Sequence, residues 1–248
     1  MRKNTAPANN KTSVTDLVLE GGGVKGIGLV GAMTELERSG YSFRRIGGTS
    51  AGAIIGALSS AGMSSAALKD LLDDFPYPKL RDKGLLDRLG PIGTGLSFLF
   101  EKGIYEGDFL RDFMIHQLES LGVRTWADLK IDDEWCHDYP IEQRYKLVVI
   151  AADVTRGRLI RLPWDYKDYG LDPDTQLVAD AVRASAAIPF FYEPVKLGGS
   201  YLVDGGVVAN FPLAVLDQSS SGVPRWPTIG IHLSSKDEVH CVAVRLRH

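Results

Sequence analysis

The sequence predicts an α/β fold of three layers, in which helices cover both faces of a mostly parallel central sheet. Near the N-terminus two strand–turn–helix units follow one another, and successive units of this kind form parallel strands with helices packed on the faces. The chain has 248 residues, 44% of them hydrophobic. This length is enough to build the core of one large domain.

The two units occupy residues 16–61. The apolar strand 16–20 leads into a glycine-rich loop over 21–26, and apolar residues at helical spacing then predict a helix over 27–37. In the second unit, the strand 41–46 is followed by a turn that contains Ser50 and by a small, apolar helix. A third helix is predicted over 64–75, where a serine caps the start and apolar residues share one face.

The second half of the chain predicts further strands and helices. Residues 106–121 have apolar side chains at helical spacing and end at Gly122, a residue typical of helix C-termini. Residues 145–152 form a continuous apolar run, which is typical of a strand buried on both faces. The remaining predicted elements are a hairpin turn at 155–158 into the strand 159–162, a helix over 177–187, a hairpin about Gly198 and Gly199 within 195–203, and a strand over 228–233.

We expect one domain over residues 14–233, preceded by a flexible polar tail over 1–13. Residues 234–248 are poorly patterned and form either a C-terminal tail or a further element. Residues 76–105 are rich in proline and glycine and predict an irregular insertion. Its apolar residues either line an acyl pocket, contact a membrane surface or fill the core beneath the loop. These residues are Leu96, Phe98, Leu99, Phe100 and Ile104.

Bulk properties exclude several classes of function. The net charge of −3 gives no basic excess for a nucleic-acid partner. No run approaches the ~18 apolar residues of a membrane-spanning helix, and the polar N-terminus lacks the apolar core of a secretory signal. The two cysteines, Cys136 and Cys241, form no disulfide framework and fit a reducing compartment. We therefore expect a cytoplasmic protein whose membrane contact, if any, is peripheral.

Ser50 lies within a G-x-S-x-G pattern that it forms with Gly48 and Gly52. On a sharp strand-to-helix turn this pattern exposes the serine Oγ as a nucleophile, and the flanking glycines relieve the crowding of the turn. Short motifs also match by chance, so an ordinary strand–helix loop explains the pattern equally well when it is considered alone.

The glycine-rich loop supports two different functions. The backbone N–H groups of Gly21, Gly22, Gly23, Val24, Lys25 and Gly26 are candidates for an oxyanion hole at the start of a helix. The same spacing matches a dinucleotide-binding fingerprint, which expects an acidic residue about 20 positions later. Arg44 and Arg45 occupy that place and suit an NADP 2′-phosphate. An NADP-dependent oxidoreductase therefore stays an alternative, although it leaves the G-x-S-x-G pattern unexplained.

Asp204 is the candidate general base for Ser50. It ends a short apolar strand and is followed by Gly205 and Gly206, which allow a sharp bend and the close approach of another loop. Partial burial would raise its pKa from about 3.9 and improve its match to a serine hydroxyl, although Asp-Gly is also a common turn. No histidine is flanked by glycines or turn residues as a catalytic one would be. A Ser–Asp dyad is therefore preferred over a triad.

Four motifs in a fixed order resemble the patatin-like phospholipase family. They are Glu20-Gly-Gly-Gly-Val-Lys-Gly26, Gly48-Thr-Ser-Ala-Gly52, Ala184-Ser-Ala-Ala-Ile-Pro189 and Asp204-Gly-Gly-Val-Val-Ala-Asn210-Phe-Pro212, within residues 14–217. The resemblance implies a patatin-like fold and hydrolysis of phospholipids or other fatty-acyl esters, with no metal and no cofactor. It also implies that Ser50 is the nucleophile, Asp204 the base and 21–26 the oxyanion loop.

A second alternative is a lipid-binding domain that stays inactive until a partner activates it. An intact dyad does not establish that the pocket beside it is open. The motifs do not reach residues 76–105 or the chain after Pro212. Acyl-chain preference, headgroup preference and oligomeric state are therefore left open by the sequence.

Overall fold

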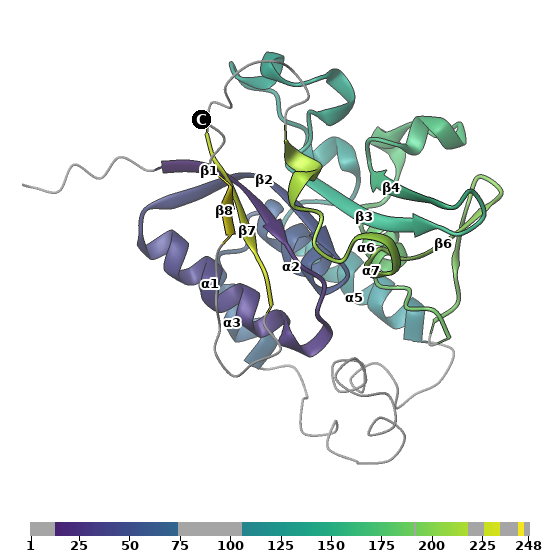
Figure 1. The fold of residues 1–248 in the computed structure, drawn as a ribbon, viewed down its shortest axis with the longest axis horizontal. Helices are drawn as coiled ribbons and strands as arrows, with labels where there is room; N and C mark the ends of the chain where they lie inside the picture. The colour runs from purple at the N-terminus through teal and green to yellow at the C-terminus, as the bar shows by residue number, and fades with distance from the viewer. Residues whose placement is uncertain (1–12, 74–105, 191, 218–225, 234–242, 246–248) are drawn as a thin grey trace, which may run out of the picture.

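The centre of the fold is a mixed sheet, shown in Figure 1. The computed structural model describes residues 13–73, 106–190, 192–217, 226–233 and 243–245. Within these residues, hydrogen-bonded neighbours link the strands along the path β5-β6-β3-β2-β1-β7-β8; β4 also pairs with β3, along the edge opposite to β2 and β6. The bounds are β1 Ser13–Leu19, β2 Tyr41–Thr49, β3 Leu147–Asp153, β4 Arg158–Leu162, β5 Val195–Leu197, β6 Ser200–Asp204, β7 Thr228–Ile231 and β8 Ala243–Arg245.

The four central strands β7, β1, β2 and β3 run parallel, and antiparallel strands flank them on both sides. Parallel neighbours need crossover connections, which α1 (Gly26–Arg38) and α2 (Ala51–Ser60) provide. Right-handed crossovers that advance in one direction across a sheet place their helices on the same face. Accordingly, α1 and α2 contact each other.

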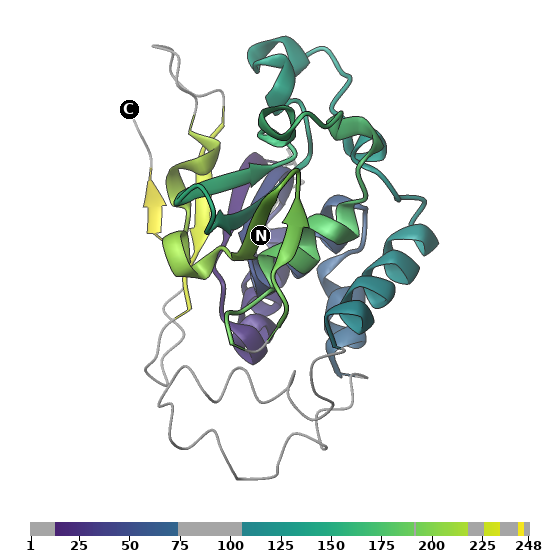
Figure 2. The same cartoon turned by 90° about the vertical axis from the view of Figure 1, so that its right-hand side faces the viewer.

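Helices of different length cover the two faces of the sheet (Figure 2). On one face α2 and α6 (Val178–Ser185) pack against the strands, and α1, α3 (Ser65–Asp73) and α5 (Glu106–Ser120) pack around them. On the other face lie the short helix α7 (Gly206–Ala209) and the 3₁₀ helix Leu213–Leu216. The described part therefore has the predicted three layers, with a thin second helical layer.

The alternation of side chains along β2 separates these two layers. A Cβ added to Gly56 of α2 would lie 3.1 Å from Ile46, whereas one added to Gly47 would lie 2.9 Å from Val215 near the short 3₁₀ helix. Successive strand residues point to opposite faces, so both faces of β2 are covered. β3 is buried along its whole length, as its continuous apolar run predicts.

Most predicted elements lie within a few residues of their expected bounds. Gly122 follows α5 with φ +78°, and Gly198 and Gly199 form the β5–β6 turn with φ +49° and +84°. Strand β8 was not predicted, because three residues that pair only with β7 carry little pattern. It lies in residues 234–248, for which the sequence left a tail and a further element open. The expected N-terminal tail and the insertion at 76–105, with its apolar patch, lie essentially outside the described residues.

Within the described part of the chain, no helix combines the length and the hydropathy needed to cross a membrane.

Candidate active site

Ser50 lies at the junction of β2 and α2 in a backbone conformation that is rare for its residue type. Its φ is +52°, in the left-handed region that costs a non-glycine residue roughly 1–3 kcal/mol. Its carbonyl accepts hydrogen bonds from Ala53 N–H at 2.9 Å and Ile54 N–H at 3.1 Å, so the strained residue directly begins α2. Such strain persists only where surrounding contacts fix it, as they do at functional sites.

The two flanking glycines are required by close backbone contacts. A Cβ on Gly48 would lie 2.3 Å from the carbonyl oxygen of Gly52. A Cβ on Gly52 would lie 2.4 Å from the carbonyl oxygen of Leu19, at the end of β1. The first turn of α2 therefore packs directly against the ends of β1 and β2, which leaves room only for glycine at both positions.

Ser50 and Asp204 are brought together because β2 and β6 meet end to end along one edge of β3. Thr49 of β2 pairs with Ile150, and Asp204 of β6 pairs with the next residue, Ala151. Because β4 pairs with Val149–Asp153 along the other edge, β2 and β6 share an edge. One residue of β3 spans about 3.3 Å, so the two strand ends are neighbours. Gly205 continues this close packing, since a Cβ there would lie 2.4 Å from the Ile150 carbonyl oxygen.

The carboxylate of Asp204 is only 5% exposed. Burial raises its pKa above the ordinary value of 3.8, while hydrogen bonds with the Gly206 backbone and the Ser50 side chain act in the opposite direction. The Gly206 N–H donates to Asp204 Oδ1 at 2.7 Å. A carboxylate with a raised pKa that hydrogen-bonds a serine is suited to accept the serine proton.

The glycine-rich loop lies beside Ser50. A Cβ on Gly21 would lie 3.3 Å from Ser50 Cβ and 2.4 Å from Asn210 Oδ1. After Gly22, the loop forms a 3₁₀ turn over Gly23–Lys25 that leads into α1 at Gly26. The first N–H groups of such a turn have no partner inside it, and the helix start carries a partial positive charge. The loop thus offers donors close to the serine, while the Lys25 side chain is exposed.

Asn210 and Glu20 hold the start of this loop. The Asn210 side-chain amide donates to Glu20 Oε1 at 3.1 Å and to the Gly21 carbonyl at 3.0 Å, and the Asn210 carbonyl accepts the Gly21 N–H at 3.0 Å. Glu20 also accepts a hydrogen bond from the backbone of Leu233. Both residues lie within the sequence motifs, but their role is not predictable from sequence, because their contacts join segments about 190 residues apart.

The contacts of the described histidines do not involve Ser50 or Asp204. His232 is 3.5 Å from Glu20 Oε1, and its ring packs edge-on against Phe211. His116 is exposed on α5, and His137 is exposed in a 3₁₀ turn. His240 and His248 lie outside the described residues.

The two arginines needed by the NADP alternative are occupied by other partners. Arg44 forms two hydrogen bonds of 2.7 Å with the carboxylate of Asp133. Arg45 is 2% exposed and donates to Asp16 and to the Leu216 carbonyl. Neither guanidinium is free to bind a 2′-phosphate in this arrangement, so the structure favours the hydrolase interpretation of the loop.

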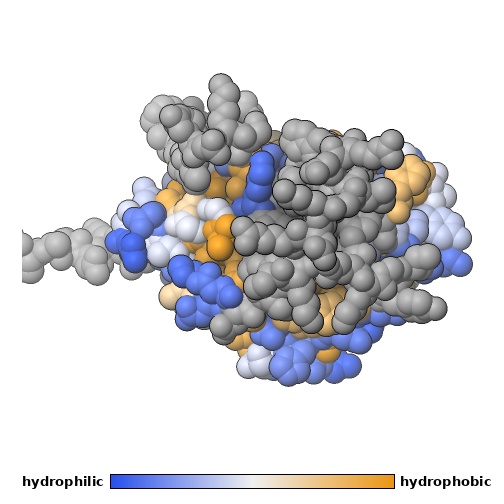
Figure 3. Space-filling model, turned by 90° about the horizontal axis from the view of Figure 1, so that it is seen from below, coloured by the Kyte–Doolittle hydropathy of each residue, from blue (hydrophilic) through white to orange (hydrophobic). Residues whose placement is uncertain are grey.

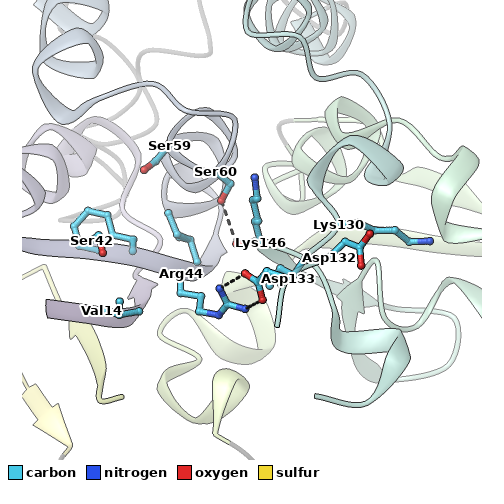
Figure 4. A pocket seen from close by; sticks show the side chains of 12 residues that line it. Val14, Ser42, Arg44, Ser59, Ser60, Lys130, Asp132, Asp133 and Lys146 are labelled. Atoms are coloured by element: carbon cyan, nitrogen blue, oxygen red, sulfur yellow. Dashed lines mark hydrogen bonds and ion pairs between the residues drawn. The ribbon is translucent and has the colours of Figure 1, made fainter. Parts of the chain in front are cut away.

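A cavity of about 580 Å³ lies away from Ser50 (Figure 4). Its walls come from the first half of β2, the end of α2 and residues 130–133, and include Arg44 and Lys146. Ligands of open α/β sheets bind beyond the carboxyl ends of the strands, where Ser50 lies, whereas the cavity lies toward the opposite end. Its lining includes neither Ser50, Asp204 nor any residue of the 21–26 loop.

A serine on a strained strand-to-helix turn, beside a buried carboxylate at the carboxyl edge of an α/β sheet, defines the class of this site as a candidate serine hydrolase. The chain belongs to the patatin-like phospholipase family, whose model matches residues 17–217.

Relatives support the same assignment. The chain is 37% identical over 226 residues to "Uncharacterized protein YqhO" of Bacillus subtilis (strain 168), a match that covers 90% of this chain and 72% of the relative. It is 24% identical over 204 residues to "Probable lipid hydrolase 463L" of Invertebrate iridescent virus 6, which covers 80% of this chain and 62% of the relative.

A solved structure shares the fold. A chain in the structure of full-length SpcU in complex with full-length ExoU from Pseudomonas aeruginosa matches with a TM-score of 0.52 and 22% identity. The match covers 92% of this chain and 45% of that chain, so this chain spans less than half of its length.

Proposed function

We propose that the chain is a serine lipid acyl hydrolase, a carboxylic ester hydrolase that cleaves fatty-acyl esters of glycerolipids such as phospholipids. One observation carries the proposal: the ends of β2 and β6 are neighbours on one edge of β3, so the strained Ser50 lies close to the buried Asp204. Membership of the patatin-like phospholipase family supports the substrate class. The viral relative described as a probable lipid hydrolase supports it too.

In the proposed acylation step, Asp204 accepts the proton of the Ser50 hydroxyl as Oγ bonds to the ester carbonyl carbon. The carbonyl electron pair moves to the oxygen, whose charge is stabilised by backbone N–H groups of residues 22–24. The N–H groups of Gly21, Lys25 and Gly26 already donate to backbone carbonyls. When the intermediate collapses, the carbon–oxygen bond to the leaving alcohol breaks. The alcohol oxygen takes the proton from Asp204, and the acyl group stays on Ser50.

In the proposed deacylation step, water attacks the acyl-enzyme carbonyl and Asp204 accepts its proton. The bond between Ser50 Oγ and the acyl carbon then breaks, the fatty acid leaves and Ser50 regains its proton from Asp204. One carboxylate serves both half-reactions. In each of them Asp204 first accepts the proton of the attacking hydroxyl or water and then returns it to the leaving oxygen.

Peripheral contact with a lipid surface is part of the proposal, with the cytoplasm as the proposed location. Ile27 follows the glycine-rich loop and is 46% exposed, and Val207 follows Gly206 and is 60% exposed. We propose that these two side chains, next to the site motifs in sequence, contact acyl chains of the lipid surface. On the face seen in Figure 3, the described surface carries apolar side chains among polar ones.

Hydrolysis of a short-chain nitrophenyl ester and of phospholipid vesicles tests the proposal. We expect the parent to release product from both, and Ser50→Ala to lose kcat by on the order of 10⁴-fold or more. Ser65→Ala, which changes a buried serine of α3, is the control. A folded parent that co-sediments with vesicles without hydrolysing either substrate would instead support the lipid-binding alternative.

A further inference from the structure

Ser185, the last residue of α6, connects the nucleophile turn to β3. Its side chain is fully buried, with 0% exposed. Its Oγ accepts a hydrogen bond from the Ser50 N–H at 2.9 Å and donates one to the Ile150 carbonyl at 2.6 Å. One hydroxyl therefore satisfies two buried backbone groups, one in the turn that follows β2 and one in β3.

These two groups are the pair that an uninterrupted β2–β3 ladder would join directly. The Ile46 N–H donates to the Lys146 carbonyl at 2.8 Å, and the parallel register continues to Thr49 opposite Ile150. A parallel ladder repeats every two residues, so the position equivalent to Ile46 at the end of β2 is Ser50, and its expected acceptor is Ile150. Instead, the Ser185 hydroxyl stands between them.

The same segment also holds the backbone of the proposed base. Two residues after Ser185, the Ala187 carbonyl accepts the Asp204 N–H at 2.8 Å. The C-terminal end of α6 and the residues after it therefore contact the backbone of both dyad residues. This arrangement fixes Ser50 and Asp204 relative to one another through a single short stretch of chain.

We propose that Ser185 is a positioning residue whose hydroxyl replaces a ladder hydrogen bond and so holds Ser50 in its strained turn facing Asp204. The inference rests on the proposed function and deepens it. The Ser185 hydroxyl bonds two backbone groups, the Ser50 N–H and the Ile150 carbonyl, so it acts through Ser50 and takes no part in proton transfer.

Loss of the hydroxyl leaves two outcomes for the backbone. Either the Ser50 N–H and the Ile150 carbonyl stay buried without a partner, at about 1–3 kcal/mol each, or the turn relaxes until they bond directly. Relaxation would release the positive φ of Ser50 and move its Oγ away from Asp204. A displacement of about 1 Å, even when its cause lies away from the substrate contacts, lowers the reaction rate by on the order of 10²-fold.

The test compares the folded variants Ser185→Ala, Ser185→Cys and Ser65→Ala with the parent. Cysteine fills the serine site but is a weak hydrogen-bond partner, so it separates hydrogen bonding from volume and serves if the alanine variant does not fold. Ser65 is a matched control, because it is 2% exposed and its hydroxyl donates a hydrogen bond to the side chain of Glu37 in α1 rather than to a group of the dyad. The readouts are kcat and KM on a short-chain ester, the rate at which a fluorophosphonate labels Ser50, and the crystal structure of Ser185→Ala.

We expect both Ser185 variants to lower kcat and the labelling rate by on the order of 10²-fold with KM changed by less than about threefold, the pattern of lost transition-state geometry. Ser65→Ala should keep the parent's kcat and labelling rate. The inference is overturned if the folded Ser185 variants label at the parent's rate. If the parent itself is not labelled, the proposed function fails, and the crystal structure then decides: an unchanged positive φ at Ser50 in Ser185→Ala overturns the inference as well.

Discussion

Asp204 carries a conflict between stability and chemistry, because burial raises the pKa of a carboxylate that catalysis requires in its ionised form. Between the unfolded and the folded pKa, the native state binds more protons than the unfolded state. Stability therefore falls as the pH rises through that interval, and the cost is fully present above the folded pKa. Burial of Asp204 thus lowers the stability of the fold but makes the carboxylate a stronger base.

Asp204→Asn is accordingly expected to stabilise the protein at pH 7. Asparagine keeps an acceptor for the Gly206 N–H but carries no charge, and a gain on the order of 1 kcal/mol corresponds to a melting-temperature rise of about 2–4 °C. The gain should vanish near pH 4, close to the unfolded pKa of about 3.9. Thermal melts at both pH values measure it, with the exposed Asp70→Asn as control. Equal melting temperatures for parent and variant at pH 7 would contradict the role of burial.

The pH dependence of hydrolysis should show the same group. For an uncharged ester, kcat/KM is expected to fall on the acid side with a single apparent pKa above 3.8, because protonated Asp204 cannot accept the serine proton. A pH–rate profile of the parent measures this limb. An acid limb at the ordinary aspartate pKa, or no acid limb at all, would contradict the assignment.

Ser50 and Asp204 could be predicted from sequence because glycines mark the sharp turns that follow their strands. Ser185, Glu20 and Asn210 could not be assigned a role in the same way. Each acts by bonding backbone groups that become neighbours only once the strand register is known. A buried serine in an alanine-rich helix carries no local signal that it bridges two strands.

The turn between β2 and α2 depends on backbone contacts that exclude side chains. Gly52→Ala would place a Cβ 2.4 Å from the Leu19 carbonyl oxygen. This clash can be relieved only if the backbone of α2 or β1 moves. We expect destabilisation of more than about 3 kcal/mol, at the extreme of single substitutions. Urea unfolding measures the loss.

Gly31→Ala is the matched control for this prediction. Gly31 lies in α1, which covers the same face of the sheet as α2, but a Cβ on Gly31 would meet nothing within 4 Å. Alanine in an exposed helix interior is favoured over glycine by up to about 1 kcal/mol, so this variant should be as stable as the parent or more stable. If Gly52→Ala behaved like Gly31→Ala, the proposed packing of α2 on the strand ends would be wrong.

The parallel centre of the sheet could be predicted because its strands alternate with helices along the chain. The antiparallel edges were less predictable: glycine marks the hairpin turn before β4 and the one between β5 and β6, whereas β8 is three residues long and pairs with one strand only. The thin layer of α7 and the neighbouring 3₁₀ helix has too few turns to show helical periodicity.

The two ends of the central strands serve different purposes across the molecule. The carboxyl ends carry Ser50 and Asp204, while the amino-terminal half of the sheet contains a buried ion pair between Asp16 of β1 and Arg45 of β2, each side chain 3% exposed. Arg45 also stacks 4.1 Å from the Tyr139 ring centre. These contacts tie two central strands to a loop that covers their start.

Removal of one partner of this pair should destabilise the protein without changing its chemistry. Asp16→Ala leaves the Arg45 charge buried and unpaired, at a cost of about 3–5 kcal/mol, whereas replacing both partners with leucine and methionine should cost much less. Urea unfolding gives the free energies, and kcat at a temperature where both variants are folded should match the parent. A single variant as stable as the double variant would contradict the assigned role of the pair.

The central claim is that Ser50 is a nucleophile activated by Asp204, and fluorophosphonate labelling with mass-spectrometric mapping tests it most directly. The account predicts that the probe modifies the parent at Ser50, and that the folded Asp204→Asn variant is modified at a rate lower by on the order of 10²-fold or more. Modification at another residue, or labelling of Asp204→Asn at the parent's rate, would contradict the account.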